Sequence, residues 1–559
     1  MSTCKQCKAQ FEVGEQEKKL ATACGVPLIP QCHTCRRKAR MQWRNEIVLY
    51  NNTCSLCHKD IVAVYPKDSV FPVYCEDCWW SDIWSAEDYG MDFKQDVPFF
   101  KQFHELLKAV PRPGLTVSNN TNCAYVNYTN YSNGSYFTFG CKEANGCLYS
   151  WRTEHCNDCV DSSQLTNSEY CFESIDCEKC YRVHFSRNAI NCNESFFLLN
   201  CVSCSDCFGC VNLTRKSCCI FNKQYSKEEY AQKIKQYDLS SFKELQKIKR
   251  EFHSFSLKFS RKYGNNNNCE VCTGDTLSHC KDVNNCFSIV KGWNCFDVYS
   301  GEDIKDALSC DIAGWPGELV YNNISGCVNA YDVKCCSTCW SCARAEYCDN
   351  CHHSEDIFGC VGLKKNQYCI LNKTYTKEEY EKLRQTIVES LKEAGEYGFF
   401  FPAWASPHAY NESIAQDYYP LTKEDARING FQWRDNLPGT KGKETIAQED
   451  MPDCIDAVED SITNEVLACI ECNRNYKIIK QELTFYRKEN FALPRMCPQC
   501  RIRGRLHMKN SLELYHRQCM CSLSGHDHTG QCTREFETTY SPERPEKVFC
   551  EQCYQKEVV

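Results

Sequence analysis

Residues 192–210 read CNESFFLLNCVSCSDCFGC, and every third position in this stretch is a cysteine, a serine or a leucine. The residues between those positions include asparagine, glutamate, aspartate and phenylalanine. A helix repeats every 3.6 residues and a strand every two, so neither element explains a strict period of three. The stretch therefore indicates a backbone that points one residue inward and the next two outward.

The same rule covers a much longer segment. The 31 positions taken in threes from Cys123 to Leu213 hold 13 Cys, 8 Ser, 3 Thr, 3 Leu, 2 Ala and 2 Val, so none is charged or aromatic. Stacked short coils that bury a column of small side chains produce this pattern, which predicts a narrow β-solenoid. A coil of about 21 residues superposes Cys159, Cys180 and Cys201, and a coil of about 18 residues is the alternative.

A second copy of the solenoid follows the first. CFGCVNLTRKSCCIFNKQYSKEEY at 207–230 matches IFGCVGLKKNQYCILNKTYTKEEY at 357–380. Ser226 and Thr376 each precede a glutamate by three residues, which is typical of a capping box at the start of a helix. These signals predict a helix that covers the exposed end of each solenoid, over 227–260 and over 377–394.

The 30 cysteines between 123 and 369 allow several roles. Buried free thiols that act as small apolar side chains are the first interpretation. Stacked disulfides and additional sites for zinc or another soft metal are alternatives. CVSCSDCFGC at 201–210 is also close to an iron–sulfur spacing, although its last gap is short and no proline follows.

Pairs of the form Cys-x2-Cys occur at both ends of the chain with matching gaps. Cys7 to Cys32 and Cys472 to Cys497 both span 25 residues. Two such pairs place four thiolates around one tetrahedral Zn²⁺ and leave no open position for a substrate. The pattern predicts about four structural zinc ions, held by Cys4, Cys7, Cys32 and Cys35; by Cys54, Cys57, Cys75 and Cys78; by Cys469, Cys472, Cys497 and Cys500; and by Cys519, Cys532, Cys550 and Cys553.

One of these sites contains an insert. MCSLSGHDHTGQ separates Cys519 from Cys532, where the other three sites have two residues. Cys521, His526 and His528 in this insert are also metal-ligand types and are competing candidates for the last zinc. The matched gaps elsewhere favour Cys519 and Cys532.

A basic segment follows the second cysteine pair of each end module. Arginine-rich helices beside zinc sites can contact a phosphate backbone, whereas a solvated helix is the alternative. The hypothesis assigns contacts with RNA, DNA or a ribonucleoprotein to Arg36, Arg37, Lys38, Arg40, Arg501, Arg503, Arg505 and Lys509.

Composition narrows the class of protein. Forty-nine cysteines in 559 residues, with no signal peptide visible at MSTCKQCKAQ, favour a reducing cytoplasm. No run of about 18 apolar residues exists, so no membrane span is expected. The net charge of −8 excludes a uniformly basic nucleic-acid binder but allows a local basic patch. No glycine-rich phosphate loop, GxSxG or HExxH motif is present, so we expect a protein that is not an enzyme.

Several longer phrases resemble a known family. ALPRMCPQCRIRGRL at 492–506, FETTYSPERPEKVFCEQCYQKEV at 536–558 and GEYGFFFPAWASP at 395–407 look like an uncharacterised family of cysteine-rich zinc-ribbon proteins. That family occurs in small-genome, uncultured bacteria of candidate phyla. The resemblance implies zinc in the terminal modules and a bacterial cytoplasmic origin, and it brings no assigned activity.

Together these patterns predict a multidomain, mainly β protein with two tandem cysteine-rich β-solenoid repeats and capping helices, flanked by duplicated modules of zinc-ribbon or treble-clef type. The leading hypothesis is a non-enzymatic zinc-binding scaffold that binds nucleic acid or a ribonucleoprotein. Metal storage or thiol redox buffering, and a solenoid that binds protein, are the alternatives. The expected divisions are a zinc module (1–90), a linker (91–115), two solenoid copies with their helices (116–262 and 266–395), an aromatic linker (396–465) and a second zinc module (466–559).

Overall fold

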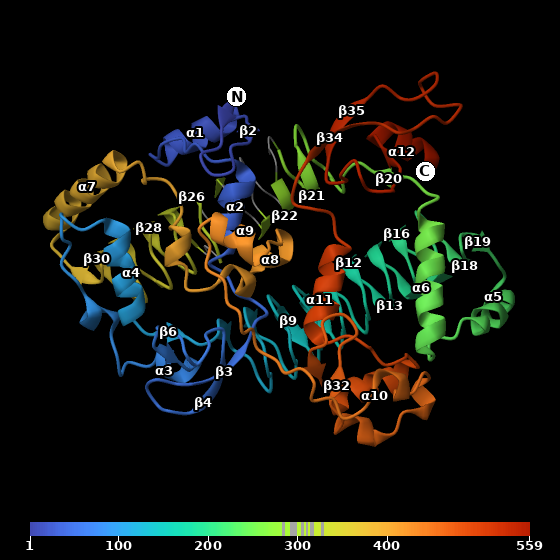
Figure 1. The fold of residues 1–559 in the computed structure, drawn as a ribbon. Helices are drawn as coiled ribbons and strands as arrows, with labels where there is room; N and C mark the ends of the chain where they lie inside the picture. The colour runs from blue at the N-terminus through green and yellow to red at the C-terminus, as the bar shows by residue number, and fades with distance from the viewer. Residues whose placement is uncertain are drawn as a thin grey trace.

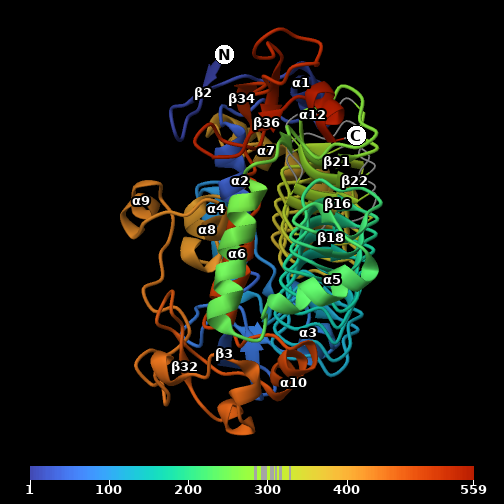
Figure 2. The same ribbon diagram turned by 90° about the vertical axis from the view of Figure 1, so that its right-hand side faces the viewer.

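Two β-solenoids form the body of the protein (Figure 1). They lie side by side, the first coloured teal and green, the second olive and gold. Figure 2 shows the coils edge-on, with most of the remaining helices and loops gathered on one side of them. The computed structural model describes residues 1–281, 286–290, 299–302, 307–308, 311–313, 318–325 and 329–558.

Each coil of the first solenoid contains 12 residues. Parallel strand pairing joins Arg187 to Ile175 on one side and to Leu199 on the other, and it joins Cys207 to Cys219. The expected coil lengths of about 21 and about 18 residues were therefore wrong. All three lengths are multiples of three, so the period of three in the sequence fits each of them equally well.

The period of three arises from one left-handed residue in each triplet. The residue directly before each inward position has a positive φ, for example 51° at Arg182, 52° at Phe185 and 53° at Asn188. Such a residue turns the chain, and a 12-residue coil therefore has four corners. Non-glycine residues adopt this conformation at a cost of about 1–2 kcal/mol each. Hydrogen bonds between coils offset that cost, as where the Asp161 N–H donates to the Leu148 carbonyl at 3.0 Å.

The predicted inward track is confirmed. From Cys141 to Cys210, every third side chain is buried. The Cys159 sulfur lies 3.5 Å from the carbonyl oxygens of both Asn157 and Ser168, which places a weak thiol donor beside the backbone of two coils. The hydroxyl of Ser174 makes the same two kinds of contact, 3.2 Å from the Phe172 carbonyl oxygen and 2.9 Å from that of Val183. Cysteine and serine therefore both occur along the track, because each is small and each can donate a hydrogen bond.

The central cysteines in the described residues are free thiols. Burial raises the pKa of Cys141 to about 12, so this thiol stays protonated at neutral pH and is a poor nucleophile. Cys201, Cys204, Cys207 and Cys210, the candidate iron–sulfur run, all point into the core of the first solenoid. Three of the 30 central cysteines, Cys295, Cys310 and Cys327, lie outside the described residues.

The strands of the first solenoid are short and parallel, except at the final hairpin. One sheet consists of β7 (Val117–Ser118), β8 (Thr129–Asn130), β9 (Lys142–Asn145), β10 (Glu154–Asn157), β11 (Ser163–Thr166), β12 (Ile175–Glu178), β14 (Arg187–Ile190) and β16 (Leu199–Val202). The other consists of β13 (Tyr181–His184), β15 (Asn193–Phe196), β17 (Ser205–Phe208), β18 (Ser217–Ile220) and β19 (Lys223–Gln224).

The second solenoid repeats this plan. Its first sheet holds β21 (Gly274–Ser278), β22 (Cys286–Val290), β23 (Tyr299–Glu302) and β25 (Asp311–Ala313). Its second sheet holds β24 (Ala307–Leu308), β26 (Glu318–Tyr321), β27 (Tyr331–Lys334), β28 (Ala343–Glu346), β29 (Glu355–Phe358), β30 (Gln367–Ile370) and β31 (Lys373–Thr374).

A helix follows each solenoid and begins at the predicted capping box. Helix α5 (Lys227–Lys233) starts after Ser226 and contacts β18, and helix α7 (Lys377–Glu393) starts after Thr376 and contacts β30. The single helix expected over 227–260 was wrong, because the chain turns near Tyr237 and a second helix, α6 (Phe242–Ser256), begins with Ser241 as its own N-cap.

The end modules are exchanged between the solenoids. Helix α4 (Phe99–Ala109), which follows the N-terminal module, packs on the second solenoid, where the rings of Phe99 and Phe358 are 5.2 Å apart. The C-terminal module packs on the first solenoid, where the Phe491 and Phe172 rings are 5.0 Å apart. Figure 1 shows blue helices beside the gold coils and orange helices beside the teal coils.

Short parallel pairings connect each module to the other solenoid as well. Strand β5 (Val73–Tyr74) pairs with β6 (Arg112–Pro113), which leads into the first solenoid. Strand β36 (Val548–Phe549) pairs with β20 (Arg261–Lys262), which leads into the second. Each module therefore bridges both solenoids.

Three buried histidines are expected to make the fold acid-sensitive. Burial, aided by nearby positive charges, lowers the pKa of His184, His352 and His408 to about 3 from 6.5. Between those values the unfolded chain binds more protons than the folded one, so the free energy of unfolding falls as the pH drops below 6.5. The slope is at most about 1.4 kcal/mol per pH unit for each imidazole.

His184 is the best site for testing this expectation. Its ring lies between those of Phe196 and Phe491, at 5.1 and 5.0 Å, so His184→Phe keeps an aromatic ring there and removes the titrating group. Urea denaturation at about pH 7 and about pH 5.5, with zinc present, should show a loss about 1 kcal/mol smaller in the variant than in the wild type. The exposed His353→Phe should behave as the wild type. Equal losses in all three proteins would contradict the expectation.

Candidate metal centres

Four groups of four cysteines lie in the end modules, two in each. The first pair of each group lies between two antiparallel strands, such as β1 (Ser2–Thr3) and β2 (Gln10–Phe11) around Cys4 and Cys7. The second pair begins a helix, as Cys32 does for α2 (His33–Met41). The N-terminus of a helix favours negative charge, which suits a thiolate. The other strands and helices of these groups are β3 (Tyr50–Thr53), β4 (Asp60–Ala63), α3 (Glu76–Trp80), β32 (Leu467–Ala468), β33 (Asn475–Tyr476), α11 (Pro498–His507), β34 (Tyr515–Gln518), β35 (Glu535–Thr538) and α12 (Glu551–Val558).

The four sulfurs of each group are close enough to bind one ion. Within every group all sulfur atoms lie within 4.8 Å of one another. The Cys7 and Cys32 sulfurs are 3.6 Å apart, and those of Cys472 and Cys497 are 3.8 Å apart. A tetrahedron with zinc–sulfur bonds of about 2.3 Å has edges of about 3.8 Å. The structure brings the 16 predicted cysteines together in these four groups, and the donor set and spacing fit zinc.

Backbone geometry supports the sulfurs. The N–H groups of Cys32, Cys75 and Cys550 donate to the sulfurs of Cys4, Cys54 and Cys519 at 3.4, 3.3 and 3.2 Å. In three groups the residue after the first pair adopts a left-handed conformation, with φ values of 63°, 60° and 56° at Lys8, His58 and Asn473. This turn folds the backbone around the sulfurs of the pair.

Several of these thiols ionise more easily than an ordinary cysteine. Hydrogen bonds from the neighbouring cysteine lower the pKa of Cys32 and of Cys497 to about 5. Burial acts in the opposite direction at Cys54, but backbone N–H groups hold its pKa at about 6. The same hydrogen bonds raise the pKa of Cys35 and of Cys500. Thiolates bind metal and thiols do not, so Cys32, Cys54 and Cys497 are the thiols that favour binding of a divalent ion at neutral pH.

A fifth group shares one residue with the fourth. Ligand atoms of Cys521, His526, His528 and Cys553 also lie within 4.8 Å of one another. The sequence placed the first three residues in competition with Cys519 and Cys532. In the structure, both sets of residues lie within ligand distance of the Cys553 sulfur.

The basic segments face the solenoids rather than solvent. In the N-terminal module, Arg36 pairs with Glu17 at 2.5 Å and Arg40 pairs with Asp311 at 2.5 Å. Arg37 donates to the carbonyl of Leu512 at 2.5 Å. All three arginine side chains are almost completely buried.

The C-terminal module repeats these contacts on the first solenoid. Arg501 pairs with Asp161 at 2.5 Å and with Glu482 at 3.0 Å, and its guanidinium lies 4.3 Å from the centre of the Tyr149 ring. Arg505 pairs with the other oxygen of Asp161 at 3.0 Å. Arg501 and Arg505 are 6 % and 3 % exposed. Burial raises the pKa of Glu482, and Arg501 beside it acts to lower it.

The predicted nucleic-acid contacts are therefore wrong for Arg36, Arg37, Arg40, Arg501 and Arg505, because a buried guanidinium cannot reach a phosphate backbone. The remaining candidates are half-buried and already occupied. Lys38 lies over the Tyr419 ring, Arg503 pairs with Asp417, and Lys509 pairs with Asp176.

Sequence reasoning missed the acidic partners of these arginines. The duplication contained the signal: residues 17, 36 and 40 match 482, 501 and 505 at a common spacing of 465. Coil by coil from Ser337 and Arg187, which are 150 apart, Asp311 corresponds to Ser163, and Asp161 lies two residues before Ser163. The pair of Glu17 and Arg36 recurs as Glu482 and Arg501 at the duplication spacing, which indicates a contact that both modules share.

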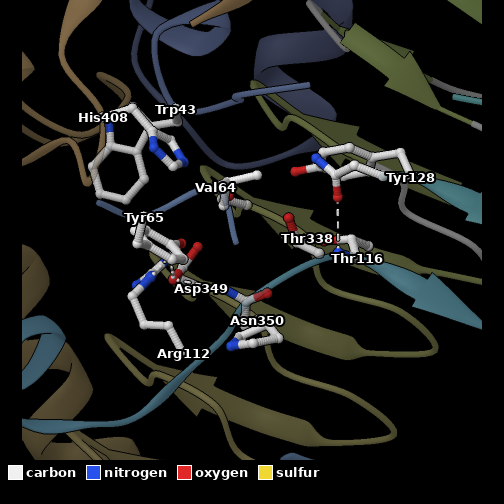
Figure 3. A pocket seen from close by; sticks show the side chains of 13 residues that line it. Trp43, Val64, Tyr65, Arg112, Thr116, Tyr128, Thr338, Asp349, Asn350 and His408 are labelled. Atoms are coloured by element: carbon white, nitrogen blue, oxygen red, sulfur yellow. Dashed lines mark hydrogen bonds and ion pairs between the residues drawn. The ribbon is translucent and has the colours of Figure 1, made fainter. Parts of the chain in front are cut away.

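A small cavity lies where the N-terminal module meets both solenoids (Figure 3). Arg112 and Asp349 form an ion pair there at 2.7 Å, and Arg112 also donates to the Tyr65 hydroxyl at 2.7 Å. Thr116 and Tyr128 line it from the start of the first solenoid. The cavity has room for about one water molecule, which is too small for a substrate.

No family model matches the chain, and no curated protein matches it significantly. In the part of the chain that the structure describes, no helix is both long and apolar enough to cross a bilayer.

Proposed function

We propose that this protein is a non-enzymatic, zinc-binding scaffold in which four structural zinc ions hold two β-solenoids in a fixed arrangement. The observation that carries the proposal is the exchange of the end modules. In each module one metal group, that of Cys4 or that of Cys469, orients a helix with an arginine buried against the solenoid of the opposite half. A closed site of four thiolates provides structure rather than an open coordination position for a substrate.

The arrangement of each module supports this role. The hairpin and helix around each group are consistent with a zinc ribbon or treble clef. Cys497 and Cys500 lie at the start of α11, and Arg501 directly follows Cys500. A bound ion would therefore fix the direction from which Arg501 and Arg505 approach Asp161. Helices α5 and α7 would complete the scaffold as caps, because Tyr230 and Tyr380 are buried beside the last coils.

Other functions have less support in the structure. Binding of RNA, DNA or a ribonucleoprotein would need residues other than the buried arginines. Metal storage by the central cysteines would need ligand groups, and the described part of the solenoids contains none with three or more clustered ligands. Binding of a protein partner is the second candidate, because one edge of the stacked coils is left uncovered in Figure 2. Charged side chains such as Arg344, which pairs with Asp356 at 2.6 Å, lie exposed on the second solenoid.

Native mass spectrometry with and without thiol alkylation tests the proposal. We expect at least four zinc ions on each chain, one for each four-cysteine group. Alkylation of the folded protein should leave the buried solenoid thiols unmodified, because they are protonated and inaccessible. Alkylation after unfolding and chelation should modify them, which serves as the control.

Two results would overturn the scaffold. Fewer than four zinc ions would remove its structural basis, and many more ions, or iron with visible absorbance, would favour storage or redox buffering. Salt-sensitive binding of RNA or DNA in a fluorescence titration would establish a nucleic-acid function on another surface.

A further inference from the structure

The insert MCSLSGHDHTGQ is the one place where the duplicated metal modules differ in cysteine spacing. In the N-terminal module, strands β3 and β4 are joined by the short turn that carries Cys54 and Cys57. In the C-terminal module, the equivalent strands β34 and β35 are joined by residues 519–534. The longer loop contains three additional metal-ligand residues, Cys521, His526 and His528.

The loop brings these residues together with one cysteine of the original site. The Cys521 sulfur is 3.2 Å from Nδ1 of His526, and the Cys553 sulfur is 3.4 Å from Nε2 of His528. All four ligand atoms lie within 4.8 Å of one another. The four side chains thus offer the two-cysteine, two-histidine set that is typical of closed zinc sites.

A second contact orients His528 as a metal ligand. Its Nδ1 lies 2.9 Å from the carbonyl oxygen of Gly530, where it can donate a hydrogen bond. That donation fixes the tautomer and leaves the lone pair of Nε2 directed toward Cys553. Histidines that bind metals in proteins are usually held by such a contact on the other ring nitrogen.

Cys553 belongs to both groups and is the residue that decides how they are filled. Its sulfur is within binding range of Cys519, Cys532 and Cys550 on one side, and of Cys521, His526 and His528 on the other. A thiolate has lone pairs enough to bind two zinc ions at once. Two divalent ions with five thiolates and two neutral imidazoles carry a single net negative charge, against two for one ion with four thiolates. The second ion therefore reduces the charge that must be buried.

We propose that the C-terminal module holds a binuclear zinc centre in which the Cys553 thiolate bridges two ions. One ion is bound by Cys519, Cys532, Cys550 and Cys553, and the other by Cys521, His526, His528 and Cys553. The proposal rests on the proposed function, because it requires zinc in the four-cysteine groups.

Native mass spectrometry of the full chain separates the two proposals. Five zinc ions on the wild type are expected if both hold. Four ions would overturn the binuclear centre and leave the scaffold intact, and fewer than four would overturn the scaffold itself. The double variant His526→Ala with His528→Ala should lose one ion and keep four. His58→Ala, in the N-terminal module beside a site without the insert, is the matched control and should keep all five.

Cadmium-113 NMR tests the bridge directly. In protein reconstituted with ¹¹³Cd, two signals that show scalar coupling to each other are expected, because a shared sulfur connects the two metals. The coupling should disappear in the double histidine variant, while the four remaining signals persist. Five uncoupled cadmium signals would overturn the bridging role of Cys553.

Discussion

Replacement of Cys500 by serine is expected to release the C-terminal module from the first solenoid. This cysteine closes a four-thiolate group at the start of α11, and the next residue is Arg501, which is buried against Asp161. Structural zinc contributes about 10–16 kcal/mol to the folding of small zinc domains at neutral pH. That exceeds or equals the total stability of most domains, which is about 5–15 kcal/mol. Loss of the ion should therefore unfold the module.

Hydrogen exchange and native mass spectrometry measure this effect. The variant should lose one zinc ion, and residues 466–510 should lose protection, while the coils of the first solenoid keep it because they bond to one another. Cys454→Ser, at a cysteine outside the metal groups, should retain both zinc content and protection. If Cys500→Ser also retained its protection, zinc would not be what holds the module in place.

Replacement of Asp161 by alanine is expected to destabilise the protein by about 3–5 kcal/mol. Asp161 is 1 % exposed and pairs with both Arg501 and Arg505. Its removal leaves Arg505 as a buried cation without a carboxylate, whereas Arg501 keeps Glu482. The cost of an uncompensated buried charge is much larger than the net gain from an ion pair.

Urea denaturation of a double-mutant cycle measures this second effect. Arg505→Met in the Asp161→Ala background should recover part of the lost stability, because it removes the uncompensated charge. Arg344→Ala is the control, since Arg344 is 43 % exposed and its pair with Asp356 lies at the surface. It should cost no more than about 1 kcal/mol. A similar cost for Asp161→Ala and Arg344→Ala would contradict the proposed role of the buried pair.

The metal groups were predictable because their geometry is local. The spacing of Cys32 and Cys35 places both sulfurs at the start of one helix, and the turn around Cys4 and Cys7 presents the other two. The place of Cys553 in two candidate ligand groups was not predictable. It depends on how the insert folds over the fourth site, and the spacing of cysteines contains no information about that path.

The burial of the arginines, in contrast, was not predictable from the sequence. Arg36 and Arg501 each directly follow a cysteine of a four-cysteine group. Both lie on basic segments, and the sequence alone gives no reason to expect these side chains to be buried. Asp161, the partner of Arg501, and Asp311, the partner of Arg40, lie hundreds of residues away on the solenoids. A cluster of positive charge has the same composition whether it faces phosphates or carboxylates, so only the packing of the modules distinguishes the two.

By itself, the sequence determined which residues face inward, where each solenoid ends and which 16 cysteines form the four metal groups. Each of these depends on interactions within a few residues: one left-handed corner in each triplet, a capping box, and a pair of thiols on one turn. The tertiary structure decided the coil of 12 residues and the exchange of modules between the solenoids. Coil closure depends on the sum of many small backbone rotations, and docking of the modules depends on which distant charges meet. No short stretch of the sequence therefore specifies either of them.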